Sequence, residues 1–429
     1  MKRIVLIVLA VGLVGAVIAS TQLGQPAMGE VLESEKQRVT APDVSTSEQA
    51  SLVEGNSAFA FDLYRELKGE EGNLFYSPHS ISLALAMTYA GARGETAEQM
   101  ADTLNFTLEQ EELHAAFNWL DAELASRGEE AEGKDGKEFR LNIVNAIWGQ
   151  EGYDFVSDFL DVLAENYGAG LRIMDFKNEA EQARLGINRW VGEQTEGRIR
   201  DLIPRGAISE LTRLVLTNAV YFNAAWEHSF ERRMTSNGPF YLLDGGQVTV
   251  PMMRQTESFG YTEGEGYQAV ELLYDGRELS MVILLPESGK FEDFEKKLVA
   301  QKMSDITSGL QRRGVALTMP RFEFESGFSL NDALCNMGMP DAFAWQKADF
   351  SGMTGDPDLF ITDVVHKAFV SVDEAGTEAA AATGAVMAPT AGPPEPEVEV
   401  TVDRPFIFLI RDINTGAILF VGRVLNPGT

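Results

Sequence analysis

Alternating small side chains near the C-terminus indicate a segment that could change its conformation. An apolar segment, Phe360 to Val372, runs into the acidic pair Asp373 and Glu374 and then into a tract of small residues. Small residues occupy every second position of this tract, at Thr377, Ala379, Ala381, Thr383 and Ala385. Side chains of a strand alternate between two faces, so this tract has one face small enough to slide between two existing strands, with Glu378 on the other face toward water. The pattern suggests a loop that can become a central strand, although Ala-rich tracts are also typical of linkers and short helices.

The chain lacks the motifs of common enzyme active sites. It contains no H-E-x-x-H, no G-x-S-x-G, no Gly-Lys-Ser phosphate loop and no Cys-x-x-Cys. The histidines His79, His114, His228 and His366 are scattered, and nothing places a serine on a strained turn beside one of them. The single cysteine, Cys335, lies in an apolar pattern and is expected to be a small core residue. We therefore expect no catalysis, no metal and no cofactor.

Composition narrows the partners. The chain has 429 residues, 45% of them hydrophobic, which is enough for one large domain or a few smaller ones. Its 65 acidic against 35 basic residues give a net charge of -30. Nucleic acids and anionic membranes both require clustered Lys and Arg, so neither is expected as a partner.

The N-terminus has the pattern of a targeting segment. Lys2 and Arg3 precede an almost unbroken apolar run from Ile4 to Ala19, and small residues follow at Ala19 and Ser20. This predicts a signal peptide over residues 1–20, and hence a secreted or periplasmic protein, with an uncleaved anchor as the alternative. One cysteine allows no intramolecular disulfide, and an exported chain without disulfides favours a prokaryotic origin. Residues 21–49 are polar and aperiodic and are expected to form a flexible lead-in.

Helical and strand patterns are mixed in the remainder of the chain. Apolar spacing predicts helices over residues 80–92, 107–127, 156–167, 180–196 and 330–337. Strands are expected over residues 141–148, 214–222, 267–273, 279–285 and 315–324, and residues 214–222 are apolar enough to be covered on both faces. Residues 406–410 and 417–424 flank Asn414-Thr415-Gly416, which predicts a hairpin. Because the two kinds of element do not alternate strictly, the fold class is α+β.

Several segments together resemble the serpin family, and they occur in the family's order over roughly residues 50–428. They are Asn73 to Ile81, Ile187 to Trp190 with Thr195 to Ile199, Leu216 to Phe222 with Trp226 and Phe230, Val250 to Met253, His366 to Thr383, Asp403 to Ile410, and Gly416 to Pro427. The resemblance implies a metastable fold of three β-sheets and about nine helices, forming one domain over residues 50–429. It also implies an exposed reactive-centre loop, at about residues 375–400.

The function implied by this resemblance is suicide inhibition of serine endopeptidases through a covalent complex with the target. The hinge of such a loop is expected at Glu374, Gly376, Thr377, Glu378, Ala379, Ala380, Ala381 and Ala382. It contains no proline and no charge on its small face, which favours an active inhibitor. A bulky inward side chain would clash with a close-packed interior. The alternatives are a non-inhibitory serpin-like binding or chaperone protein and an exported hydrolase.

The bait bond is expected at Thr390-Ala391, counting along the loop from Glu374 as in the family. Small and medium apolar neighbours suit an elastase-like or subtilisin-like pocket. The segment after the cut, which begins at Pro393, is longer than usual. This length leaves Met387-Ala388 as a second choice, favoured by a chymotrypsin-like enzyme.

By the same resemblance, a polar cluster beneath the opening sheet is expected from Ser77, Ser80, Asn218 and His366, with Trp226 where the loop first enters. Ordinary, satisfied core polar groups are an equally acceptable explanation for these residues. The helix over residues 107–127 is rich in Asp and Glu, with Arg127 as its one Lys or Arg, so no heparin site is expected there. The protein is expected to be a monomer.

Overall fold

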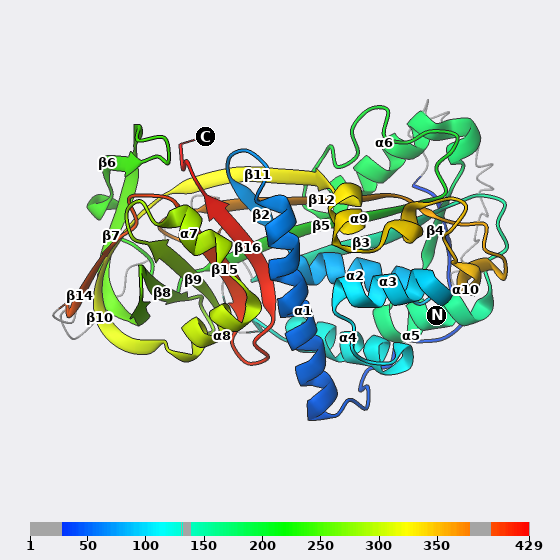
Figure 1. Ribbon diagram of the computed structural model, residues 1–429, viewed down its shortest axis with the longest axis horizontal. Coiled ribbons are helices and arrows are strands. Elements are labelled where there is room, and N and C mark those ends of the chain that lie inside the picture. The colour runs from blue at the N-terminus through cyan, green and yellow to red at the C-terminus, as the bar shows by residue number, and fades with distance from the viewer. Residues whose placement is uncertain (1–27, 130, 132–138, 378–395, 429) are drawn as a thin grey trace, which may run out of the picture.

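A central sheet runs along the long axis of the molecule (Figure 1) in the computed structural model, which describes residues 28–129, 131, 139–377 and 396–428. Strand β5 lies at its middle, where its burial on both faces matches its apolar sequence. Within the described ranges this sheet has seven strands. In spatial order they are β1 (Glu30–Leu32), β4 (Leu171–Met174), β3 (Arg140–Gln150), β5 (Leu214–Ala225), β13 (Gly376–Thr377), β12 (Ile361–Val372) and β11 (Phe322–Ser329).

Helices cover both faces of the central sheet. The helix α6 (Phe176–Gln194) lies on one face, where Trp190 packs edge-to-face on Trp148 of β3 and the Arg172 guanidinium stacks 4.4 Å from the Trp190 ring centre. On the other face lie α2 (Pro78–Tyr89), buried along its whole length, and the helices grouped with it in Figure 1. The other helical elements are α1 (Thr46–Leu67), α3 (Gly94–Leu104), α4 (Gln110–Ala125), α5 (Ser157–Tyr167), α7 (Phe291–Lys296), α8 (Ala300–Ser308), α9 (Asn331–Met337) and α10 (Ser351–Thr354), with short 3-10 turns at η1 (Arg232–Met234) and η2 (Pro340–Phe343).

A second group of strands forms the other end of the molecule. Its spatial order is β14-β10-β7-β8-β9-β15-β16-β2, with β6 beside β7. The 18-residue strand β7 pairs with β6 in its first part and with β8 in its last part, so two of the three expected sheets are joined here into one hydrogen-bonded sheet. The strands are β2 (Leu74–Tyr76), β6 (Ser236–Tyr241), β7 (Gln247–Gly264), β8 (Tyr267–Leu273), β9 (Leu279–Pro286), β10 (Gln311–Pro320), β14 (Val398–Thr401), β15 (Phe406–Asp412) and β16 (Ile418–Val424).

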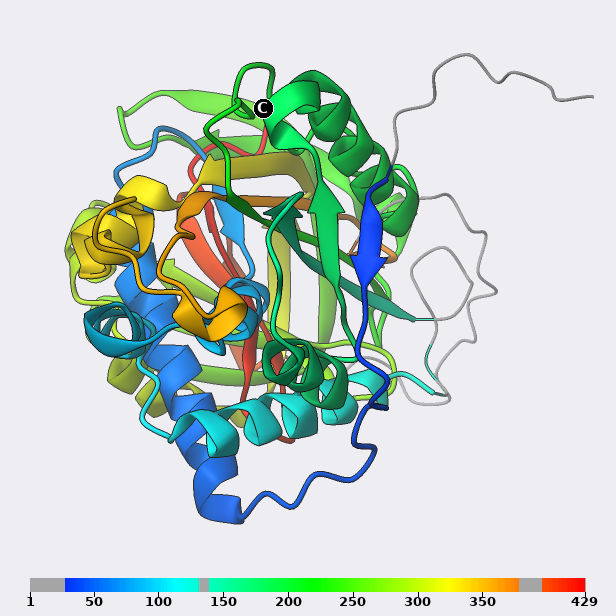
Figure 2. The same ribbon diagram turned by 90° about the vertical axis from the view of Figure 1, so that its right-hand side faces the viewer.

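The segment before the first helix differs from the sequence prediction. A flexible lead-in was expected over residues 21–49, but from Met28 onward the chain is placed against the domain, and α1 begins at Thr46. Figure 2 shows β1 at the edge of the central sheet, where it pairs antiparallel with β4. Local periodicity did not reveal β1 because the strand has three residues and depends on partners more than a hundred positions away.

The predicted α+β fold is confirmed, and the ten α-helices of the described ranges are close to the nine expected. Two segments with a predicted function lie outside these ranges. They are the predicted signal peptide, residues 1–20, and most of the predicted reactive loop, residues 378–395.

Candidate functional site

The hinge lies in a wedge between the two central strands. Strands β5 and β12 pair directly in parallel from Ile361 to Ala368 of β12 and from Leu214 to Val220 of β5. Beyond this stretch they separate, and β13 occupies the gap, with Thr377 opposite both Ala224 of β5 and Val372 of β12. The chain therefore turns back on itself after β12 and begins a new strand inside its own sheet.

Gly376 is required by the close approach of β5. A Cβ atom at this position would lie 2.1 Å from the Ala224 carbonyl oxygen and 2.8 Å from the Ala225 Cα, both backbone atoms that cannot yield. Its φ of 157° is also one that side-chain-bearing residues seldom adopt. The glycine predicted for the hinge is thus placed where a side chain has no room.

Glu374 anchors the turn that leads into the hinge. Its side chain is 3% exposed, and one carboxylate oxygen accepts hydrogen bonds from the Arg321 guanidinium and the Thr235 hydroxyl. Its carbonyl oxygen accepts from the Phe230 N–H at 2.8 Å. Burial acts to raise the pKa of Glu374, but the hydrogen bonds from Arg321 and Thr235 outweigh it and hold the pKa below the ordinary value.

Trp226, the residue directly after β5, contacts the same turn. Its backbone N–H donates to the Ala375 carbonyl at 2.9 Å, and its indole Nε1–H donates to the Asp373 carbonyl at 3.0 Å. The indole stacks on Tyr274, with ring centres 4.7 Å apart and planes 10° apart. The Tyr274 hydroxyl lies 2.7 Å from the Thr377 hydroxyl, so one continuous set of contacts runs from the indole to the hinge.

The four polar residues expected beneath the sheet do meet in one buried network. His366 and Asn218 are opposite each other across the β12–β5 pairing, and the His366 Nδ1 contacts the Asn218 side-chain oxygen. The other ring nitrogen, Nε2, accepts from the Ser77 N–H at 3.3 Å, which fixes the neutral tautomer with its proton on Nδ1. The amide nitrogen of Asn218 then donates to the Ser80 hydroxyl.

Burial keeps the His366 ring neutral, lowering its pKa to about 3. Asn145 of β3 completes the network, since its side-chain oxygen accepts from Ser80 at 3.1 Å and from Asn218. Sequence analysis missed Asn145, Arg321 and Tyr274. They belong to segments that come together only through the sheet, and no local spacing distinguishes them.

The remaining predicted hinge and bait residues lie outside the described residues, so their placement stays a prediction. They are Glu378, Ala379, Ala380, Ala381 and Ala382 of the hinge, the bond Thr390-Ala391, and the second choice Met387-Ala388.

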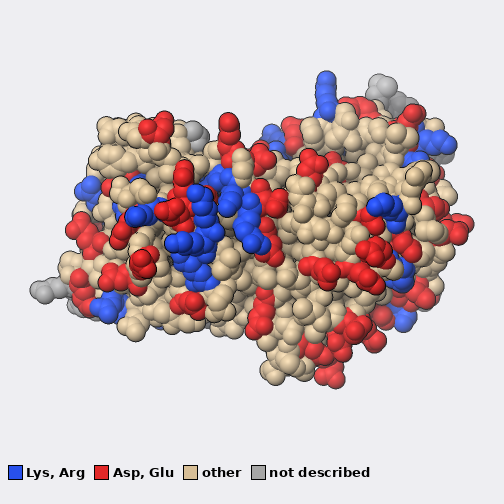
Figure 3. Space-filling model, viewed as in Figure 1, with Lys and Arg blue, Asp and Glu red and all other residues tan. Residues whose placement is uncertain are grey.

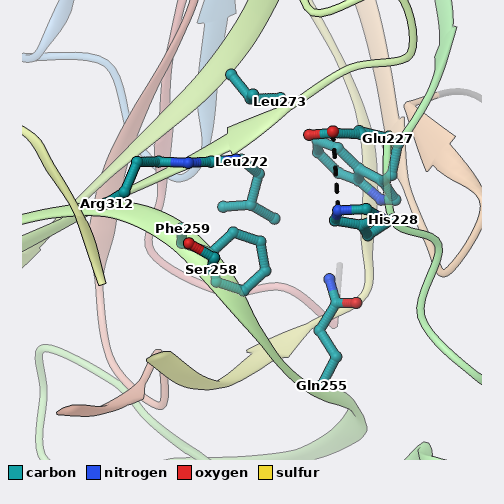
Figure 4. A pocket seen from close by; sticks show the side chains of 9 residues that line it. Glu227, His228, Gln255, Ser258, Phe259, Leu272, Leu273 and Arg312 are labelled. Carbon is teal, nitrogen blue, oxygen red and sulfur yellow. Dashed lines mark ion pairs between the residues drawn. The ribbon is translucent and has the colours of Figure 1, made fainter. Parts of the chain in front are cut away.

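A pocket beside the hinge offers no catalytic site. Figure 4 shows His228 and Glu227 forming its one drawn ion pair, with Nε2 and Oε1 3.7 Å apart. Ser258 also lines the pocket, but no hydrogen bond joins it to His228, and the pocket volume of about 10 Å³ is too small for a substrate. Among the described residues, no group of His, Cys, Asp and Glu could hold a metal ion.

Charge on the surface is unevenly distributed. Figure 3 shows acidic side chains gathered around α4, while basic side chains gather over α7 and the end of α1. The acidic surroundings of α4 support the expectation that this helix is no heparin site, which remains a prediction. Among the helices that the structure describes, none is both long and apolar enough to cross a membrane.

These features define a class of protein. In this class the chain's own hinge separates β5 from β12 at one end of the central sheet.

Comparison with known proteins agrees with this class. The family model described as "Serpin (serine protease inhibitor)" matches residues 54–427, and the chain belongs to the serpin family. It is 43% identical over 381 residues to an uncharacterized serpin-like protein of Thermococcus kodakarensis, covering 89% of this chain and 87% of that one. It is 41% identical over 387 residues to the human leukocyte elastase inhibitor, covering 88% of this chain and 99% of the inhibitor.

A solved structure shows the same fold. The thermophilic serpin tengpin in its native state superposes with a TM-score of 0.80 at 30% identity, covering 92% of this chain and 97% of tengpin. The family resemblance predicted from the sequence is confirmed, and the family's description supports protease inhibition.

Proposed function

We propose that this chain is an irreversible inhibitor of serine endopeptidases that traps its target as an acyl-enzyme by inserting its cleaved loop into the central sheet. The observation that carries the proposal is the wedge at Gly376 and Thr377, which already occupies the first positions of the strand that insertion would complete. The rest of the inserted strand would enter where β5 and β12 now pair directly, which we call the β5–β12 seam. The hinge tract that follows in the sequence carries only small residues on its inward face.

The chemistry comes from the protease. The target's serine Oγ attacks the carbonyl carbon of the bait residue, forming an ester and releasing the next residue as a free amino terminus. The loop segment before the cut then enters the sheet with the enzyme attached to its end. Distortion of the protease moves its oxyanion hole and histidine out of line, so the water that would hydrolyse the ester is no longer activated.

The target is proposed to be elastase-like or subtilisin-like. Residues on both sides of Thr390-Ala391 are small or medium apolar, and no Lys or Arg occurs from Ala375 to Val402, which disfavours a trypsin-like enzyme. The leukocyte elastase inhibitors of human and mouse, each 41% identical to this chain, are named for an elastase, which supports this specificity. Met387-Ala388 is the second bond, suited to a chymotrypsin-like enzyme. After cleavage of the signal peptide, the inhibitor would be in the extracellular or periplasmic space. We propose that it is a monomer.

The test is incubation of the purified protein, lacking residues 1–20, with pancreatic elastase, subtilisin and chymotrypsin. A covalent complex that survives denaturing electrophoresis, with a released peptide beginning at Ala391, is the expected result. Thr390→Arg is the matched variant, since it should shift inhibition toward trypsin while leaving the hinge unchanged.

Two other outcomes of this test are informative. A released peptide beginning at Ala388 would keep the mechanism and move the bond to Met387. Cleavage by all three enzymes without any complex would overturn inhibition of enzymes of these types. That result would favour a non-inhibitory binding or chaperone role.

A further inference from the structure

The segment before α1, residues 28–45, crosses the edge of the central sheet and is called the strap here. Its strand β1 pairs with β4 through Glu30, Val31 and Leu32. The approach is close enough that a Cβ atom at Gly29 would lie 2.7 Å from the Ile173 carbonyl oxygen, and one at Gly170 would lie 2.7 Å from the Leu32 carbonyl oxygen. Two glycines, each directly before one of the two strands, therefore permit this pairing.

The far end of the strap is fastened to the helices. The Arg38 Nε donates to the Asn118 side-chain oxygen of α4 at 2.8 Å, and its Nη2 pairs with Asp121 of the same helix. In return the Asn118 amide donates to the Val39 carbonyl at 2.7 Å, and the Val39 N–H donates to the Glu165 carbonyl of α5 at 2.8 Å. Asn118 is 1% exposed, so without the strap its buried amide group would lose its hydrogen bonds to Arg38 and Val39.

The strap thus ties an outer strand to the helical layer. Strands β5, β3 and β4 lie on one side of the β5–β12 seam, and β1 extends that side. Helix α4 packs against α1, which also contacts α8, α9 and β16. When a new strand enters at the seam, β4 must move away from β12, while α4 is held by helices outside the moving group of strands.

We propose that the strap restrains opening of the central sheet, with Arg38 as the positioning residue that fastens it to α4. This inference rests on the proposed function, because the motion it restrains is loop insertion. The strap sets how long the protein waits in its native form before the sheet takes up a strand. It has no role in choosing the protease.

Arg38→Ala removes a charge-assisted hydrogen bond and an ion pair, which are among the stronger polar contacts in proteins. The variant is expected to convert spontaneously from the native to the loop-inserted form about 10-fold faster than the wild type. Lys36→Ala is the matched control. Lys36 lies in the same strap, but its pair with Glu165 is at the surface, with the Lys36 side chain 54% exposed. Its conversion rate should stay within about twofold of the wild-type rate.

The experiment incubates the mature protein below its melting temperature and follows conversion on urea-gradient native gels, where the inserted form resists unfolding. A separate sample is cut in the loop with a protease that is not inhibited. The wild type should then gain heat resistance, and cut Arg38→Ala should gain as much, because the fastening acts only on the native form.

The outcomes separate the two proposals. If the cut wild type gains no heat resistance, the sheet does not accept the loop, and both the proposed function and the strap inference fail. If it gains resistance but Arg38→Ala converts at the wild-type rate, the strap inference alone is overturned. If Arg38→Ala weakens the native and cut forms equally, Arg38 has an ordinary structural role and the inference is likewise overturned.

Discussion

Replacing Thr377 by arginine tests whether the wedge at β13 is the start of the insertion path. The Thr377 side chain is 2% exposed, and its hydroxyl is paired with Tyr274, whose pKa burial raises far above the ordinary value. A guanidinium at this position would be buried. The nearest described carboxylate along the chain, Glu374, already accepts from Arg321 and Thr235.

The magnitude follows from comparing two terms. Docking of Gly376 and Thr377 rests on a few backbone hydrogen bonds and the hydroxyl contact, at about 1 kcal/mol each, or roughly 3 kcal/mol in all. An unpaired buried charge costs about 3–5 kcal/mol. The cost of burying the charge is therefore at least as large as the free energy of docking, and the hinge is expected to leave the sheet. If the same penalty applies to the insertion step, it slows insertion by about 100-fold or more.

The assay counts how many inhibitor molecules are consumed for each protease molecule inactivated. Wild-type protein should form a denaturant-stable complex, whereas Thr377→Arg should be cut and released as a substrate. Ser236→Arg is the control, because it adds the same charge at an exposed position on β6. Complex formation by Thr377→Arg at the wild-type stoichiometry would refute the reasoning, since it would mean that the wedge is not on the path.

Two further predictions concern stability. Burial lowers the pKa of His79 and His114 to about 4 and that of His366 to about 3, all below the unfolded value of 6.5. The contribution of these rings to stability is therefore complete above about pH 6.5 and is lost as the pH falls, by about 1.4 kcal/mol per pH unit for each ring. His114→Phe should reduce the slope of the urea unfolding midpoint against pH between pH 6 and 5. An unchanged slope would contradict this. Asp412→Ala leaves the buried Arg127 guanidinium, now bonded to Asp412 at 2.7 Å, without that partner and should cost about 3–5 kcal/mol in denaturant unfolding, while a loss below about 1 kcal/mol would show that the pair is not needed.

Sequence patterns were sufficient where a residue's role is set by its neighbours along the chain. The apolar run predicted as a doubly covered strand is β5, and the Asn414-Thr415-Gly416 turn joins β15 to β16, with Gly416 at a φ of 79°. In each of these cases the local pattern and the tertiary environment require the same residue type.

Sequence patterns failed where a residue's role depends on a distant partner. The Glu374 carboxylate was placed in the hinge, but Arg321 and Thr235, which hold it, come from other strands and loops. In the sequence, Asn145 is a polar residue within a mostly apolar strand and has no evident role. In the structure, its side-chain oxygen links Ser80 to Asn218. The strap was read as flexible because polar, aperiodic sequence carries no periodic signal, whereas its order comes from Asn118 and the open edge of β4.

The pairing of β5 with β12 explains how the same residues could form both the native sheet and the proposed loop-inserted sheet. Below Ala368 the strands β5 and β12 pair directly, and the Asn218–His366 contact lies on this pairing near the point where it ends. A new strand entering at Thr377 would break one β5–β12 ladder and form two ladders in its place, so the finished state gains backbone hydrogen bonds. The cost falls at the beginning, where the buried Asn218–His366 contact must open before any new ladder replaces it. A buried network that is satisfied in the closed sheet would therefore raise the barrier to the loop insertion that we propose.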